Sequence, residues 1–172
     1  MAPPANEEEI NTVELSFKKE GADALVYKWV KNDDDDGLNE AKSKIDIELE
    51  PDTEYTLTTR FLNETEDPVE DVTVEIEEED TDHQVFYIFK GDDHNITYAY
   101  GDKDSDGNPI GLTGTVRTGD AFTKTDAHQL QVVLKHEPKK DGEGVKGGDI
   151  ANAGGETDIS VTFTIETREG GA

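Results

Sequence analysis

Residues 159–165 read Ile-Ser-Val-Thr-Phe-Thr-Ile, with an apolar side chain at every second position. Residues 13–17, 45–49 and 72–76 repeat this alternation, with acidic or hydroxyl side chains between the apolar ones. Successive side chains of a β-strand point to opposite faces of the sheet, so each stretch predicts a strand with one buried and one wet face. The repeated pattern therefore indicates a protein built from antiparallel β-sheets.

The spacing of these stretches, with turn sequences between them, predicts a sandwich of about ten strands. We expect these strands at 12–17, 24–30, 44–50, 54–62, 70–78, 83–89, 94–100, 111–117, 128–136 and 158–166. Residues 49–57, LEPDTEYTL, resemble the Pro turn followed by Tyr-x-Leu that opens a strand in fibronectin-type and other immunoglobulin-like sandwiches. We therefore expect an all-β, antiparallel, immunoglobulin/fibronectin-like β-sandwich without a helix of ten or more residues.

The length of 172 residues suits one domain. We expect a flexible N-terminal tether at 1–9, a single sandwich domain at 10–167 and a frayed tail at 168–172. The net charge of −26, from 42 acidic and 16 basic residues, excludes nucleic-acid binding and repels anionic lipid surfaces. The same charge suits divalent cations or cationic partners. Since the chain has no cysteine, disulfides and thiolate metal sites are also excluded.

Four further stretches carry a family resemblance. They are HQVFY at 83–87, DKDSDGNPIGL at 102–112, LKHEPK at 134–139 and NAGGETDI at 152–159. In this order they resemble small secreted lipoproteins of Bacteroidota, over roughly residues 10–167. Members often carry the label "type 1 periplasmic binding fold", which this strand pattern does not support, because that fold is a larger α/β protein.

The resemblance implies a location outside the cell, on the outer-membrane surface. In such lipoproteins a lipid anchor is the only attachment to the membrane. The anchor is carried by a cysteine, which this sequence does not contain. It also implies a TonB-dependent outer-membrane receptor as partner, since some members are encoded beside such receptors.

Asp102, Asp104, Asp106 and Asn108 form the sharpest motif of the chain, a D-x-D-x-D-G-N loop. Carboxylates at alternate positions of a tight turn supply the hard oxygen ligands that calcium prefers. The match to an EF-hand loop ends there, because position 12 is Thr113 instead of the bidentate Glu. A solvated hairpin loop is the alternative interpretation.

The four histidines, His83, His94, His128 and His136, share the parity of apolar residues in their strands and stand at strand ends. His128 and His136 are eight residues apart, roughly 26 Å along a strand, so they cannot bind the same ion. If strands 83–89 and 94–100 pair as a hairpin, His83 and His94 stand near opposite ends of the pair. One interpretation is that a histidine at the rim of the core meets His128 or His136 across the sandwich. Such a pair would bind zinc, copper or haem; the alternative is histidines hydrogen-bonded to backbone or water.

No nucleophile elbow, metalloprotease helix or phosphate-binding glycine loop is present, so we expect no enzyme. We expect a cell-surface or secreted binding lipoprotein, accessory to outer-membrane uptake of a nutrient or metal. Recognition would fall to loops 102–111 and 138–155. Two alternatives remain: a structural or adhesive surface module, and a carbohydrate-binding module that uses Tyr87, Tyr98 and Tyr100.

Overall fold

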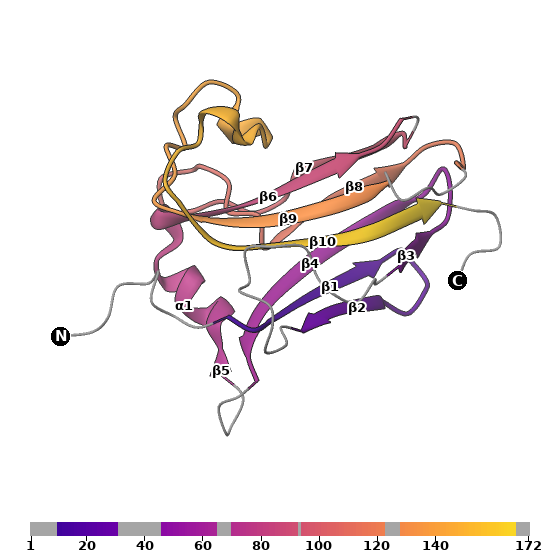
Figure 1. Cartoon of the computed structure of the whole chain (residues 1–172), viewed down its shortest axis with the longest axis horizontal. Helices are drawn as coiled ribbons and strands as arrows, with labels where there is room; N and C mark the ends of the chain where they lie inside the picture. Colours follow the sequence, from indigo (N-terminus) through magenta and orange to yellow (C-terminus); the bar gives the residue numbers. More distant parts are fainter. Residues whose placement is uncertain (1–9, 31–45, 65–69, 93, 123–127, 168–172) are drawn as a thin grey trace.

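The computed structural model describes residues 10–30, 46–64, 70–92, 94–122 and 128–167, whose strands form two packed sheets (Figure 1). The larger sheet has the order β2-β1-β4-β8-β7, with β5 paired to β4. Its strands are β1 (Thr12–Lys18), β2 (Leu25–Val30), β4 (Glu54–Asn63), β5 (Glu70–Asp71), β7 (Ile96–Tyr100) and β8 (Thr113–Thr118).

The smaller sheet has the order β3-β10-β9-β6. Its strands are β3 (Asp46–Leu49), β6 (His83–Lys90), β9 (Gln129–His136) and β10 (Glu156–Thr167). All strand pairs in both sheets are antiparallel except β3 with β10. The all-β class and the two-sheet architecture are thus confirmed. The immunoglobulin/fibronectin-like type stays a prediction, and the segments 1–9 and 168–172 lie outside the described residues.

The core lies between the two sheets and is formed by the alternating apolar side chains. The larger sheet contributes Val13, Leu15, Phe17, Leu57 and Phe61, and the smaller sheet contributes Val85, Leu130, Val132, Val161 and Phe163. Each of these ten side chains is at most 1% exposed. Burial of this apolar surface is the main stabilising contribution to the fold.

A second apolar cluster covers part of the outer face of the smaller sheet. Phe86 and Val133 point to that face and contact Val145 and Ala153 from the long loop between β9 and β10. The loop contains two short 3-10 helices, η3 (Val145–Gly147) and η4 (Ile150–Asn152). It therefore folds back onto the sheet, at the end of the sandwich where α1 lies (Figure 1).

The prediction of a strand at 70–78 is wrong after Asp71, because only Glu70–Asp71 form a strand (β5) and the rest of the segment forms helix α1 (Val72–Glu78). The Asp71 side chain caps the helix by accepting a hydrogen bond from the Thr73 backbone N–H at 3.1 Å. Val72 and Ile76, four residues apart, are buried, whereas Val74 is 48% exposed. The sequence alternates at 72–76, but the buried pair follows the spacing of a helix face.

Strands 83–89 and 94–100 do not pair as a hairpin. β6 pairs with β9 in the smaller sheet, and β7 pairs with β8 in the larger sheet. The connection between β6 and β7 therefore crosses from one layer of the sandwich to the other. This crossover separates His94 from His83 and gives each histidine a different neighbour.

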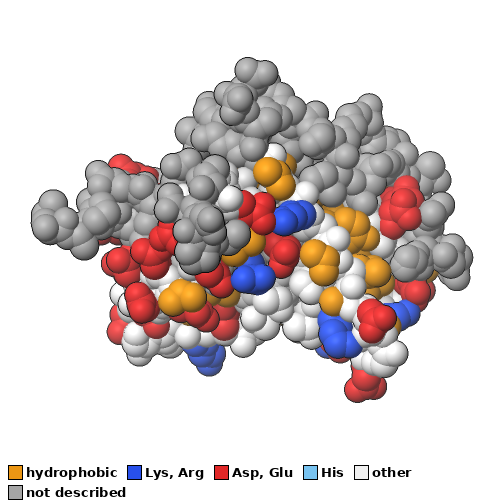
Figure 2. Space-filling model, turned by 90° about the horizontal axis from the view of Figure 1, so that it is seen from below, with side chains coloured by type: hydrophobic (Ala, Val, Ile, Leu, Met, Phe, Trp, Pro, Cys, Tyr) orange, Lys and Arg blue, Asp and Glu red, His pale blue; other side chains and the backbone are white. Residues whose placement is uncertain are grey.

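The surface carries the acidic character of the sequence. Figure 2 shows carboxylate side chains spread over one face of the molecule, with fewer Lys and Arg side chains among them. Several basic side chains of the described residues are paired with carboxylates, such as Lys28 with Glu64 at 2.8 Å and Arg60 with Asp71 at 3.1 Å. Such exposed pairs contribute little stability. Because carboxylates far outnumber basic groups, the long-range field of the molecule remains negative.

Candidate metal centre

His83 and His136 are direct neighbours in the smaller sheet. His83 is the first residue of β6, His136 is the last residue of β9, and the antiparallel register pairs one with the other. His83 Nε2 and His136 Nδ1 are 3.2 Å apart. The predicted meeting of two histidines therefore involves His83 and His136, but within one sheet instead of across the sandwich.

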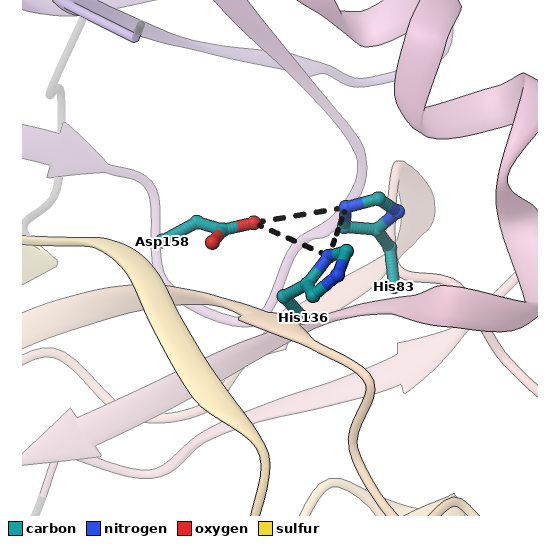
Figure 3. A group of neighbouring side chains, drawn as sticks. All are labelled: His83, His136 and Asp158. Carbon is teal, nitrogen blue, oxygen red and sulfur yellow. Dashed lines mark hydrogen bonds and ion pairs between the residues drawn. The ribbon is translucent and has the colours of Figure 1, made fainter. Parts of the chain in front are cut away.

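Asp158 joins this pair because of a β-bulge in β10. The register of β10 on β9 shifts between Thr157 and Ile159, so Asp158 is the extra residue of the bulge. A bulge redirects the side chain of the extra residue relative to the regular alternation. The Asp158 carboxylate points toward both imidazole rings (Figure 3), at 3.6 Å from His83 Nε2 and 3.9 Å from His136 Nδ1.

Gly155 permits the close approach of β10 to the end of β9. Its φ angle of +71° belongs to the left-handed region that favours glycine. A Cβ atom at this position would lie 2.5 Å from the His136 carbonyl oxygen. The backbone geometry that brings Asp158 to His136 therefore requires glycine at 155.

The three donor atoms have the spacing of ligands around a small metal ion. The three donor atoms lie 3.2, 3.6 and 3.9 Å from one another, so they form a triangle. The point at equal distance from all three atoms lies about 2.1 Å from each. Zn–N and Zn–O bonds measure roughly 2.0–2.2 Å, and a tetrahedral ion separates its ligand atoms by about 3.4 Å. His83, His136 and Asp158 are the one such group of three His, Asp or Glu residues in the described part of the chain.

The site is buried, and a hydrogen bond to a backbone carbonyl oxygen orients the His83 ring. The side chains of His83, His136 and Asp158 are 1%, 9% and 8% exposed. His83 Nδ1 bonds to the Glu79 carbonyl oxygen at 3.1 Å. Because a carbonyl oxygen can only accept a hydrogen bond, Nδ1 of His83 carries the proton. In the neutral ring, Nε2 is then unprotonated, and its lone pair faces His136 and Asp158. Backbone carbonyls orient metal-binding histidines in this way.

Two opposing effects act on the pKa of His83. Burial lowers it, because a charged imidazolium loses hydration. The Asp158 carboxylate and the Glu79 carbonyl oxygen favour the charged ring, and together they leave the pKa of His83 above its ordinary value of 6.5. The surroundings of His83 thus favour a positive charge on its ring.

The predicted calcium loop uses its carboxylates internally. Asp102 accepts hydrogen bonds from the backbone N–H groups of residues 111, 112 and 113. Asp104 Oδ1 accepts from the N–H groups of Asp106 and Asn108 at 2.9 Å. Asp106 is exposed. The carboxylates of Asp102, Asp104 and Asp106 do not form a three-residue group of donor atoms in the described part of the chain.

An ammonium group lies beside Asp104. Lys140 Nζ donates to Asp104 Oδ2 at 2.8 Å and to the carbonyl oxygens of Asp80 and Pro109 at 2.9 and 3.0 Å. The Lys140 and Asp104 side chains are 5% and 1% exposed. Burial alone would raise the pKa of Asp104, but Lys140 and the two backbone donors hold it below its ordinary value of 3.8. Calcium binding by this loop stays a prediction.

His94 and His128 lie at the other end of β6 and β9. His94 Nδ1 accepts from the Ile96 backbone N–H at 3.0 Å, and His128 Nε2 lies 2.8 Å from the Asp92 carbonyl oxygen. Burial and the nearby His128 lower the pKa of His94. Neither histidine belongs to a three-residue donor group among the residues that the structure describes. His128 and His136 thus stand at opposite ends of β9, as expected.

The tyrosines proposed for a sugar platform interact mainly with one another and with the protein. The ring centroids of Tyr87 and Tyr98 are 4.3 Å apart, and those of Tyr98 and Tyr100 are 5.2 Å apart. The Tyr87 hydroxyl donates to the Gly111 carbonyl oxygen, and the Tyr100 hydroxyl donates to that of Val85. Tyr87 is 8% exposed. This arrangement is typical of core packing.

Both predicted recognition loops meet beside the metal centre. The turn η2 (Asp80–Asp82) directly precedes His83. Ser105 of the first loop donates from its backbone N–H and its hydroxyl to the Asp80 carboxylate. Lys140 of the second loop bonds to the Asp80 carbonyl oxygen, and the Glu137 N–H bonds to the Asp82 carbonyl oxygen at 2.6 Å.

Protein-family models, curated proteins and solved structures were compared with this chain, and none of them matches it. The resemblance to Bacteroidota lipoproteins is therefore untested by these comparisons. Among the described residues, no helix has the length and apolar character needed to cross a membrane.

Proposed function

We propose that this protein is a surface or secreted binding protein that holds one divalent transition-metal ion, with zinc preferred, between His83, His136 and Asp158. The observation that carries the proposal is the triangle of buried donor atoms, with a common point about 2.1 Å from each. In this proposal the protein is accessory to outer-membrane uptake of a nutrient or metal, the role that the family resemblance implies.

The ligand chemistry favours zinc over the other candidates for this site. Two imidazoles and a carboxylate suit zinc and copper, but the triangle fits a tetrahedral ion better than the tetragonal geometry of Cu(II). Haem fits poorly, because two axial nitrogens lie on opposite sides of the porphyrin, whereas these nitrogens are 3.2 Å apart. Calcium needs six to eight oxygen ligands at longer distances.

A bound ion would act on the recognition loops. It would link β6, β9 and β10 at the end where loops 102–111 and 138–155 attach to η2. Because the ligands come from three separate parts of the chain, the ion would stabilise this end of the folded protein. The surface charge would draw cations toward the molecule.

Isothermal titration of the chelator-treated and dialysed protein with zinc tests this function. The titration needs high salt, so that weak binding to surface carboxylates is screened. We expect one tight site in the wild type and a loss of about 100-fold or more in affinity for His83→Gln or His136→Gln. His94→Gln and His128→Gln are matched controls and should bind as the wild type does. The absence of a tight site in the wild type would contradict the proposal.

A further inference from the structure

The buried site supplies three protein ligands, whereas a tetrahedral zinc ion takes four. Sites that exchange their metal or act catalytically leave one position open to water, and structural sites close it with a fourth protein group. The side chains of His83, His136 and Asp158 are at most 9% exposed. Because these three side chains are buried, a neighbouring protein group is the first candidate for the fourth position.

Glu79 has the required chemistry and location. It follows α1 directly, and its carbonyl oxygen holds the His83 ring. Its side-chain atom Oε1 is buried and has no hydrogen-bond partner among the described residues. A buried carboxylate oxygen without a partner is costly unless a cation compensates it.

Charge balance gives a second, independent argument. A divalent ion held by two neutral imidazoles and Asp158 alone would leave one net positive charge in a buried site. A second carboxylate would neutralise it, and uncompensated buried charge is strongly unfavourable. Among the acidic residues of α1 and its C-terminal cap, Glu79 is the closest in sequence to His83, and its free oxygen is buried.

We propose that the Glu79 carboxylate is the fourth ligand of the ion, so that the site is closed and the ion is retained instead of passed on. This inference rests on the proposed metal-binding function. The carboxylate is not one of the three donors already within reach of one another. Binding therefore requires rotation about the side-chain torsions of Glu79.

Glu75 provides a matched control. It lies one helical turn before Glu79, and its Oε2 atom is likewise buried without a partner in the described part of the chain. Glu75→Gln and Glu79→Gln remove the same charge from the same helix face with little change of shape. A general electrostatic effect would make the two variants alike, whereas coordination would affect the position next to His83.

The experiment measures zinc affinity by titration and zinc release to an excess of chelator, for the wild type, Glu79→Gln, Glu75→Gln and His83→Gln. We expect Glu79→Gln to bind about 10-fold more weakly or worse and to release zinc correspondingly faster. Glu75→Gln should stay within about 2-fold of the wild type. Melting curves in chelator verify that each variant folds.

A cobalt-substituted wild type gives a readout that does not depend on any variant being folded. Four protein ligands predict an intense tetrahedral Co(II) spectrum that does not change with pH, because no metal-bound water is present to titrate. A weak six-coordinate spectrum, or a spectrum that changes near neutral pH as expected for a cobalt-bound water, would contradict a closed site. Wild-type affinity in Glu79→Gln, with binding lost in His83→Gln, would overturn the assignment of Glu79 and leave the proposed function standing. Equal weakening in Glu75→Gln would also overturn it. A wild type that binds no zinc would overturn both.

Discussion

His83 and His136 occupy paired positions at the open ends of two neighbouring strands, with Nε2 of one ring 3.2 Å from Nδ1 of the other. Cross-strand neighbours at a sheet end are held by the register of the whole ladder. The eight residue pairs from His83–His136 to Lys90–Gln129 thus fix the distance between the two rings. This preorganisation is what makes the pair suitable for a metal ion.

Asp158→Asn should weaken zinc binding by about 10-fold or more, because a neutral amide oxygen replaces a charged ligand. The fold should change little, since the substitution keeps the shape of the side chain. Isothermal titration measures the affinity, and Asp149→Asn, in the loop before β10, is a control with the same chemical change. Equal affinities for the wild type and Asp158→Asn would contradict the role of Asp158.

Lys140→Met should destabilise the protein by about 3 kcal/mol, because it leaves the Asp104 carboxylate buried without its counter-ion. This loss corresponds to a drop of several degrees in melting temperature. Thermal unfolding should show the same loss in calcium and in chelator if Lys140 is the cation that serves Asp104.

The calcium prediction for the 102–108 loop is tested in the same way with Asp104→Ala. The ion pair with Lys140 predicts an equal loss of stability with and without calcium. A loss seen only when calcium is present would instead support a bound calcium ion. The two results distinguish stabilisation of Asp104 by the Lys140 ammonium group from stabilisation by a bound calcium ion.

The contribution of Asp104 to stability should depend on pH. Its folded pKa lies below 3.8, so the unfolded chain binds the proton more readily and the stabilisation is present in full above the unfolded pKa. It is lost as the pH falls through the folded pKa. Urea unfolding of the wild type and Asp104→Asn should give a difference in free energy that shrinks below about pH 4. A difference that stays constant down to pH 3 would contradict the ion pair.

A helix at 72–78 and a strand at 70–78 predict different effects of substitutions at Ile76 and Val74 on the free energy of unfolding. Ile76→Ala should cost about 3 kcal/mol because Ile76 is 1% exposed in the core. Val74→Ala should change the free energy of unfolding by less than about 0.5 kcal/mol because Val74 is exposed. In a strand with alternating faces the two side chains would share one buried face. Equal losses in chemical denaturation would therefore favour the strand.

The sequence was sufficient to predict most of the strands but insufficient to predict how they pair or which residues form the candidate site. Alternation in β1 and β10 reports burial directly, so the strands and their inner faces were predictable. At 72–76 the same alternation is compatible with either a strand or a helix. The hydrogen bond by which Asp71 caps the segment favours the helix. Which strands pair depends on long-range packing, which no local pattern contains.

Asp158 illustrates why one residue of the candidate metal centre escaped prediction. It shares the parity of Ser160 and Thr162, which places it on the wet face of a regular strand. The bulge between Thr157 and Ile159 redirects it toward the histidines. The adjacent Gly154 and Gly155, both with positive φ, are the one sequence signal of irregular backbone near this point.

Nitrogen-15 NMR of the histidine side chains during zinc titration tests the central claim most directly. We predict that zinc binds His83 through Nε2 and His136 through Nδ1, because these atoms face Asp158 (Figure 3). The resonances of both rings should change together at one equivalent of zinc, while those of His94 and His128 stay unchanged. Zinc-dependent changes at His94 or His128 instead, or at none of the four rings, would contradict a metal centre at His83, His136 and Asp158.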